Sequence, residues 1–157
     1  MRKRVLGGMV LALGLGGLAA MGGLAHAADT VTSKPDDVIA SRQAGFDLVQ
    51  GVLSAMKDSV ASSESVKPLS DGAKGLVSWG QVIPLQFPAG TETGHKTKAK
   101  PDIWSDNAGF QKAAANFVAA AQKLQTLADA DDKAGFAEQF KATGAACGAC
   151  HRTFRAR

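Results

Sequence analysis

The chain has 157 residues, with 18 Lys/Arg against 14 Asp/Glu, a formal charge of +4 and two cysteines. This length suits one domain of ordinary size together with a leader segment. Three of the positive charges lie within the first four residues. The charge balance therefore gives no support for binding of nucleic acid, which would call for a clustered basic face.

Residues 1–27 are typical of a cleaved signal peptide. A basic start at residues 2–4 precedes an apolar, glycine-rich run over residues 5–24, and Ala25-His26-Ala27 has the pattern of a cleavage site. The apolar run is long enough to be a membrane anchor, but its glycines and the cleavage pattern favour removal. Cleavage near Ala27-Ala28 would leave residues 28–157, with fifteen Lys/Arg, fourteen Asp/Glu and a formal charge of +1 instead of +4.

Four amphipathic segments follow, and each carries hydrophobic residues at alternating steps of three and four. The second starts near Ser70, the third between Pro101 and Ser105, and the fourth after Asp132. The stripes are Phe46, Val49, Leu53, Met56 and Val60; Ala73, Leu76 and Ile83; Phe110, Ala113, Phe117, Ala120, Leu124 and Leu127; and Phe136, Phe140, Thr143, Cys147, Cys150 and Phe154. This spacing is the seam of left-handed helix packing, and strand signals are almost absent. We expect an all-α, antiparallel up-down-up-down four-helix bundle.

One connection, from Pro84 to Pro101, is long. Its prolines, glycines and polar residues make it too broken for a helix. Loops of this length in compact domains are usually functional or mobile. Residues 95–100 at its end are locally basic, which fits either a solvated loop or a docking patch for an acidic redox partner.

The last helical segment contains Cys147-Gly148-Ala149-Cys150-His151, which has the spacing of a c-type haem attachment site. Each thiol can add across one haem vinyl group, and the following histidine can then bind the iron. On a helix these three side chains share one face, because residues at i, i+3 and i+4 are neighbours. The motif predicts one haem c, covalently attached through Cys147 and Cys150, with His151 as the metal ligand.

Three other interpretations of the two cysteines remain open. A thioredoxin-like redox pair requires a neighbouring βαβ pattern, for which the sequence has no strand-rich region. A structural zinc site needs four ligands, and among the histidines only His95 could supply the fourth. A disulfide between Cys147 and Cys150 within a helix would be strained and would connect nothing distant.

With this motif at the C-terminal end of a predicted bundle, the chain resembles the cytochrome c′ family, the class II c-type cytochromes. Cytochromes c′ are themselves an established example of up-down-up-down bundles, so the resemblance implies the same fold. The similarity covers essentially all of residues 28–157. Besides the motif, its residues are Arg42-Gln43, Phe87, Gly90-Thr91-Glu92, Pro101-Asp102-Ile103-Trp104-Ser105-Asp106 and Arg155.

The resemblance implies roles for individual residues. Cys147 and Cys150 would form the thioether bonds, and His151 would be the proximal iron ligand. Residues bordering the haem would be Arg42, Gln43, Thr91, Glu92, Phe46 over the distal face and Arg155 near the proximal histidine. Solvated or ordinary loop positions remain alternatives for Arg42, Thr91 and Glu92. Trp79 and Trp104 would be core residues or would flank the haem.

The sixth coordination position of the iron decides the chemistry. Phe46 occupies the place where low-spin members of the family carry methionine, and phenylalanine cannot ligate iron. Met56 is the only methionine of residues 28–157, and it lies about 15 Å further along the helix axis. His95 remains as a candidate sixth ligand. We expect a five-coordinate, high-spin haem that prefers NO and CO to O₂ under an apolar cover.

Two functions remain, and one protein could serve both. One is periplasmic electron transfer with a redox partner, and the other is a module that sequesters or senses nitric oxide. A low-spin, six-coordinate electron carrier is a further alternative. The distal position offers no acid or base, so we do not expect an enzyme. The family resemblance also implies a homodimer through the first two helices, with Ala55, Ala61 and Gly80 allowing close packing.

Overall fold

The computed structural model describes residues 33–62 and 64–157. The expected leader and its cleavage position near Ala27-Ala28 lie outside the described residues. The elements are α1 (Pro35–Ser62), α2 (Ser70–Val82), α3 (Asp102–Ser105), α4 (Asn107–Asp129) and α5 (Lys133–Phe154), with 3₁₀ turns at Lys67–Leu69 and Ile83–Gln86. None of the helices described has the length and apolar character needed to span a membrane.

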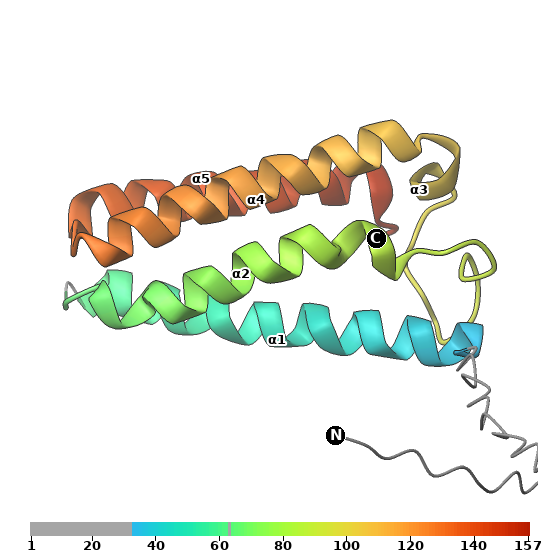
Figure 1. Cartoon of the computed structure of the whole chain (residues 1–157), viewed down its shortest axis with the longest axis horizontal. Coiled ribbons are helices and arrows are strands. Elements are labelled where there is room, and N and C mark those ends of the chain that lie inside the picture. Colours follow the sequence, from blue (N-terminus) through green and yellow to red (C-terminus); the bar gives the residue numbers. More distant parts are fainter. Residues whose placement is uncertain (1–32, 63) are drawn as a thin grey trace, which may run out of the picture. The chain divides into compact units, whose positions relative to one another are not determined.

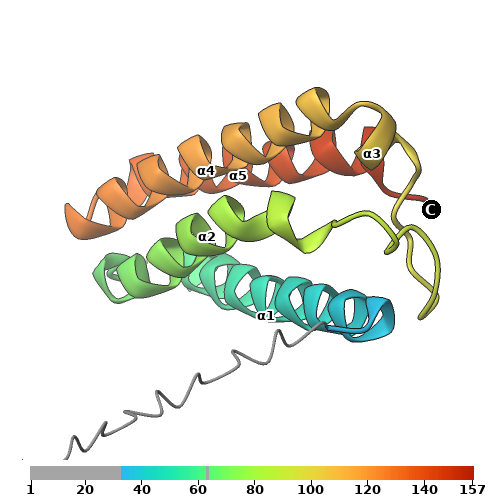
Figure 2. The ribbon, with the colours of Figure 1, turned by 45° about the vertical axis from the view of Figure 1, so that its right-hand side comes forward.

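The four long helices run alternately in opposite directions (Figures 1 and 2). α1 lies beside α2 in both views, α4 lies beside α5, and α4 also packs against α2. The C-terminus lies at the end of the bundle that contains α3 and the loop before it. The predicted all-α, up-down-up-down four-helix bundle is therefore confirmed.

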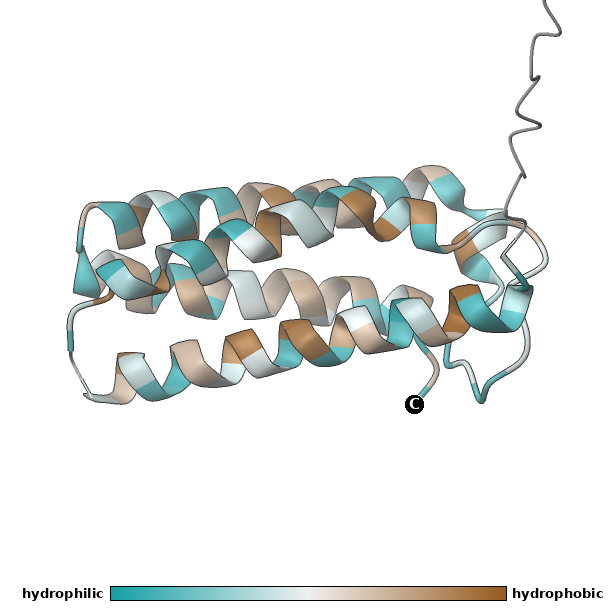
Figure 3. Ribbon diagram, turned by 60° about the horizontal axis from the view of Figure 1, so that its bottom comes forward, coloured by the Kyte–Doolittle hydropathy of each residue, from teal (hydrophilic) through white to brown (hydrophobic). Residues whose placement is uncertain are grey.

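The core lies along the facing sides of the helices, where hydrophobic residues recur between polar ones (Figure 3). α4 contributes Phe110, Phe117 and Leu124 to this core, as its sequence period predicts. Gly80 lets α2 approach α4 closely, because an added Cβ would lie 2.7 Å from Val118 Cγ2 and 2.9 Å from a Phe117 ring carbon.

The third predicted segment consists of two helices, because the chain turns at Asp106. This residue has φ −118° and ψ 58°, outside the helical region, and its side chain accepts a hydrogen bond from the Gly109 amide at 3.0 Å. It therefore caps α4 instead of continuing α3, as expected for an aspartate at this position. Asp132 caps α5 in the same way by accepting from the Gly135 amide at 2.9 Å.

The long loop is shorter than its sequence suggested. Residues up to Gln86 form a 3₁₀ turn, with Pro84 at a position in its first turn where no backbone N–H is needed. The expectation of irregular structure from Pro84 onward is wrong for this short stretch. Residues 87–101 contain only turns, bends and one isolated bridge.

Asp131 joins the two connections at the opposite end of the bundle. Its carboxylate accepts hydrogen bonds from Ser65 Oγ at 2.9 Å, Val66 N at 2.8 Å and Lys67 N at 3.2 Å. These hydrogen bonds lower the pKa of Asp131 from its ordinary value of 3.8. The residue has φ +53°, a left-handed conformation that aspartate and asparagine tolerate better than most residues.

We predict that Asp131→Asn destabilises the protein most at neutral pH. Asparagine keeps an acceptor and tolerates the backbone conformation, but it loses the charge. A lowered folded pKa stabilises the protein above the unfolded pKa, and this stabilisation disappears as the pH falls through the folded value. The difference between wild type and variant in urea midpoint should therefore shrink between pH 7 and pH 3. Asp58→Asn, on an exposed position of α1, is the control; a difference independent of pH would contradict the account.

Candidate functional site

The motif cysteines lie on α5, on the side that faces the bundle. Cys147 and Cys150 are free, half-buried and packed against the hydrophobic core, whereas His151 is exposed. Burial raises the pKa of both thiols, so they are protonated at neutral pH. Although His151 has an exposed side, the loss of water around the rest of its ring, and secondly the charge of Arg155, lower its pKa. This favours the neutral imidazole that can bind a metal.

A groove beside the motif shows that α4 and α5 leave space next to one cysteine. It has a volume of about 280 Å³ and Cys150 in its lining. Small residues of both helices form much of its wall, among them Gly109, Ala113, Ala146 and Ala149. Ala113, one of the alanines predicted at the α4 seam, therefore leaves space beside Cys150.

Phe46 lies on α1 with its ring against Trp79 of α2. The ring centroids are 5.5 Å apart and the planes are perpendicular, an edge-to-face contact. Gly45 makes room for the indole, because an added Cβ would clash with its ring atoms. Trp79 Nε1 is buried and has no hydrogen-bond partner among the described residues. A buried N–H without a partner is costly to the free energy of folding.

Arg42 lies one turn before Phe46 and is only 2% exposed. Nη1 donates to Gln86 O at 3.3 Å and to Thr91 Oγ1 at 2.9 Å; Nη2 donates to Thr91 O and Thr97 Oγ1, both at 2.9 Å. Its Cζ lies 4.4 Å from the centroid of the Phe87 ring. Burial lowers the pKa of Arg42, while nearby Glu92 opposes this effect. Arg42 is thus a buried residue whose hydrogen bonds hold the loop against α1.

The other predicted polar residues belong to the same cluster. Gln43 Nε2 donates to His95 O at 3.1 Å. Thr91 is 2% exposed and its hydroxyl donates to Pro88 O at 2.8 Å, whereas Glu92 Oε1 accepts from Gly90 N at 3.1 Å. The structure therefore brings Arg42, Thr91 and Glu92 together through contacts with the loop, and their expected place at the haem stays a prediction.

Arg155 follows the last residue of α5 and is exposed. It forms an isolated antiparallel bridge with Ala99 of the loop. On either side of this bridge, Lys100 N donates to Phe154 O at 3.0 Å and Ala156 N donates to Lys98 O at 2.8 Å. The backbone that carries Arg155 is therefore held by the loop.

The two other candidate iron ligands are engaged elsewhere. Met56 is 1% exposed and its Cε lies 3.1 Å from the position of an added Cβ at Gly72, so it is a core residue between α1 and α2. His95 is exposed, and its Nε2 lies 3.8 Å from Asp36 Oδ2. Within the described part of the chain, no group of three or more His, Cys, Asp or Glu residues could hold a metal ion.

Three contacts of this region could not be expected from the sequence. Nothing in the sequence distinguishes Thr97 from Thr93, or Lys100 from the other loop lysines, because their contacts arise only when the chain folds. Trp79 was expected in the core or beside the haem, but its unpartnered N–H could not be foreseen. A single sequence contains no local pattern that would predict these contacts.

A family model described as Cytochrome C′ matches residues 37–155 of the chain. The chain belongs to the cytochrome c′ family. Cytochrome c′ of Rubrivivax gelatinosus is 42% identical over 130 residues, which cover 78% of this chain and 96% of that protein. Haem c is the cofactor of this family, and the chain is a mono-haem c-type cytochrome with two cysteines at the required spacing.

Solved structures of the family have the same fold. A nitric oxide complex of a mutant of cytochrome c prime from Alcaligenes xylosoxidans superposes with a TM-score of 0.72 at 29% identity, over 80% of this chain and 98% of that chain. A cytochrome c′ with an unusual ligand-controlled dimer dissociation superposes with a TM-score of 0.75 at 25% identity, with the same coverage.

The side chains present fit haem c. Two free thiols and a histidine lie on consecutive turns of one helix, where thioether bonds and an axial ligand are needed. The groove next to Cys150 gives space beside the attachment face. Trp79 packs against the same hydrophobic core as the two cysteines, and its buried N–H has no partner among the described residues.

We predict that denatured wild-type protein retains the mass of one haem. Cys147→Ala combined with Cys150→Ala should abolish this retention, because no thiol remains to form a thioether bond. Intact-mass spectrometry under denaturing conditions measures both. Ser54→Ala, at an exposed position of α1, is a control for handling and expression. Loss of haem from denatured wild type would contradict covalent attachment.

Proposed function

We propose that the chain is an exported, periplasmic cytochrome whose sixth iron position is open. Residues 1–27 would be removed, and residues 28–157 would form the mature domain. Cys147 and Cys150 would carry the haem, and His151 would be its proximal ligand. Haem c supplies an iron that exchanges electrons and binds diatomic gases. The protein would accordingly carry electrons and bind gases, and we assign no residue to acid or base catalysis.

The placement of Phe46 is the observation that most supports this proposal. It lies one turn after Arg42, at the position that the family resemblance assigns to the distal cover, and its ring is held against Trp79. Met56 is committed to the core and His95 to the surface beside Asp36, so neither supports a sixth ligand. These placements favour five-coordinate over six-coordinate iron.

The apolar ring of Phe46 also favours binding of NO and CO over O₂. An apolar ring offers no hydrogen bond to a polarised ligand such as bound O₂, whereas CO and NO depend less on such a bond. The nitric oxide complex of the Alcaligenes xylosoxidans relative supports the same chemistry for this chain. Arg42, Thr91 and Glu92 would border the site and hold the loop beside it, and Arg155 would border the proximal side.

Electron transfer remains a second function, and one observation favours it. The basic tail of the loop, residues 95–100, pairs with the segment immediately after the haem-bearing helix α5. Positive charge is thereby collected near the end of α5, where Arg152, Arg155 and Arg157 are also exposed. Such a surface suits a periplasmic redox partner with acidic groups.

We further propose a homodimer through α1 and α2, which the ligand-controlled dimer of a relative supports. Leu48 of α1 and Leu85, just after α2, are each 74% exposed. Gly80 was expected to assist dimer packing, but this is wrong because the residue is buried against Phe117 and Val118 of α4 within the same chain.

Leu48→Glu should weaken the dimer, because a carboxylate would be buried in an apolar contact. Sedimentation equilibrium over micromolar concentrations should give a higher fraction of monomer than for wild type. Gln50→Glu adds the same charge at an exposed position about 200° away around α1, and it should leave the dimer unchanged. A monomeric wild type would contradict the dimer, and an unchanged Leu48→Glu dimer would contradict this interface.

Phe46→Met should convert the ferrous spectrum towards six-coordinate low-spin and weaken CO binding, because a thioether can reach where the phenyl ring cannot ligate. Phe46→Ala should leave the iron high-spin and accelerate CO association, since the cover is removed. Absorption spectra and CO flash photolysis measure these effects. The ring is half-buried, so Phe46→Ala should cost less than the ~3–5 kcal/mol typical of fully buried phenylalanine.

Phe117→Met is the matched control, because Phe117 is buried between α2 and α4 at Gly80. It should alter stability but neither spin state nor CO binding. A wild-type ferrous protein that is already low-spin and does not bind CO would contradict the open position. His95→Ala would then test the remaining candidate ligand.

A further inference from the structure

Thr97 connects the α1 side of the site to the C-terminal segment. Its Oγ1 accepts from Arg42 Nη2 at 2.9 Å and from Ala99 N at 3.2 Å. The first bond ties the loop to the helix that carries Phe46. The second fixes the backbone at Ala99, the residue that forms the bridge with Arg155. The Thr97 hydroxyl oxygen therefore connects Arg42 of α1 with the loop backbone that pairs with the C-terminal segment.

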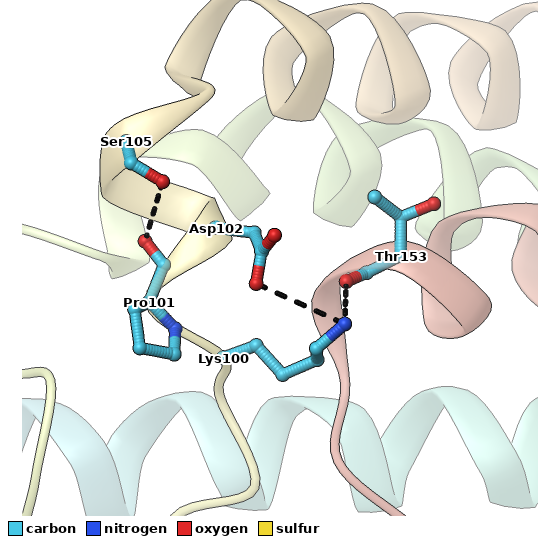
Figure 4. Close-up of polar contacts among 5 residues, drawn as sticks. All are labelled: Lys100, Pro101, Asp102, Ser105 and Thr153. Carbon is cyan, nitrogen blue, oxygen red and sulfur yellow. Dashed lines mark hydrogen bonds and ion pairs between the residues drawn. The ribbon is translucent and has the colours of Figure 1, made fainter.

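Beyond Thr97, the loop holds the end of α5 by three hydrogen bonds. Two are the backbone bonds from Lys100 N to Phe154 O and from Ala156 N to Lys98 O. The third is from Lys100 Nζ to Thr153 O at 2.6 Å, with Asp102 Oδ2 at 3.8 Å from the same nitrogen (Figure 4). A lysine cation at the last carbonyls of a helix is favourable, because it satisfies a free acceptor and complements the helix dipole.

A row of aromatic rings forms a second connection between the same two places. The Arg42 guanidinium lies over the Phe87 ring, and Phe87 contacts Phe110 with centroids 5.1 Å apart. Phe110 in turn contacts Phe154 at 5.2 Å. Phe154 is the last residue of α5 and is followed by Arg155. Arg42 thus reaches the end of α5 by hydrogen bonds and by ring packing.

We propose that Thr97 is a positioning residue through which Arg42, on the Phe46 side of the site, holds Arg155 beside His151. This inference rests on the proposed function, which places Phe46 and His151 on opposite faces of one haem. A displacement of α1 at Phe46 would be transmitted along the loop to the segment that follows the axial ligand. The connection gives the two faces of the haem a link in addition to the direct packing of α1 against α5.

Three variants isolate the Thr97 hydroxyl. Thr97→Val keeps the shape and removes the acceptor, whereas Thr97→Ser keeps the acceptor and should behave as wild type. Thr93→Val is the matched control, because Thr93 lies in the same loop and its hydroxyl has no hydrogen bond among the described residues. Thermal unfolding of the haem-loaded proteins shows first that each variant is folded.

Hydrogen–deuterium exchange of the peptide covering residues 152–157 is the first measurement. A hydrogen bond contributes roughly 1 kcal/mol net, so exchange there should be about fivefold faster in Thr97→Val and unchanged in the other two variants. The second measurement is the iron–histidine stretching band of the ferrous protein by resonance Raman, which should shift only in Thr97→Val.

Unchanged C-terminal exchange in Thr97→Val, or an equal change in Thr93→Val, would overturn the role of Thr97. Faster exchange with an unmoved iron–histidine band would show that the segment loosens without affecting His151, and it would overturn the link to the proximal side. A wild type without an iron–histidine band would instead contradict the proposed function, while the exchange comparison would still decide whether Thr97 holds the C-terminal segment.

Discussion

A buried guanidinium requires acceptors for its N–H groups, and Arg42 obtains them from the loop between α2 and α3. An arginine that is 2% exposed would be strongly destabilising without these partners. Gln86, Thr91 and Thr97 supply them, and the Phe87 ring covers the cation. A loop rich in glycine and proline is thereby fixed at one end of the bundle, where α1 begins and α5 ends.

This constraint reaches the end of the haem-bearing helix because the same loop also pairs with the C-terminal segment. After Thr97 it pairs with residues 154–156, so the chain that follows the Cys-x-x-Cys-His motif is not a free end. The motif itself lies on a helix whose start is capped by Asp132 and whose end is held by Lys100. The segment that follows the motif is therefore held by a loop that is distant from it in sequence.

The sequence was sufficient to predict the fold, because helix period is a local property. The stripe from Phe136 to Phe154 correctly placed both cysteines on the inward side of α5, and its start after Asp132 is confirmed. The break at Asp106 was missed, since a cap and a helix interior differ there only by backbone conformation. The roles of Arg42 and Gln43 at the haem remain predictions, although their contacts with the loop are now known.

Other features could not be read from one sequence. A small residue such as Gly80 is compatible with close packing at a dimer interface and with close packing inside one chain. Only its contacts with Phe117 and Val118 show that it packs inside the chain. The unpartnered Trp79 N–H and the two bonds accepted by Thr97 depend on residues far away along the chain. Tertiary contacts of this kind carry no local signal.

The central claim is that His151 is the only protein ligand of the iron and that Phe46 covers an open position. X-ray absorption at the iron edge of the ferrous, ligand-free protein tests it most directly, because it measures the number of coordinating atoms. The account predicts five nitrogen ligands, four from the porphyrin and one from histidine. A sixth nitrogen or sulfur at bonding distance would contradict it.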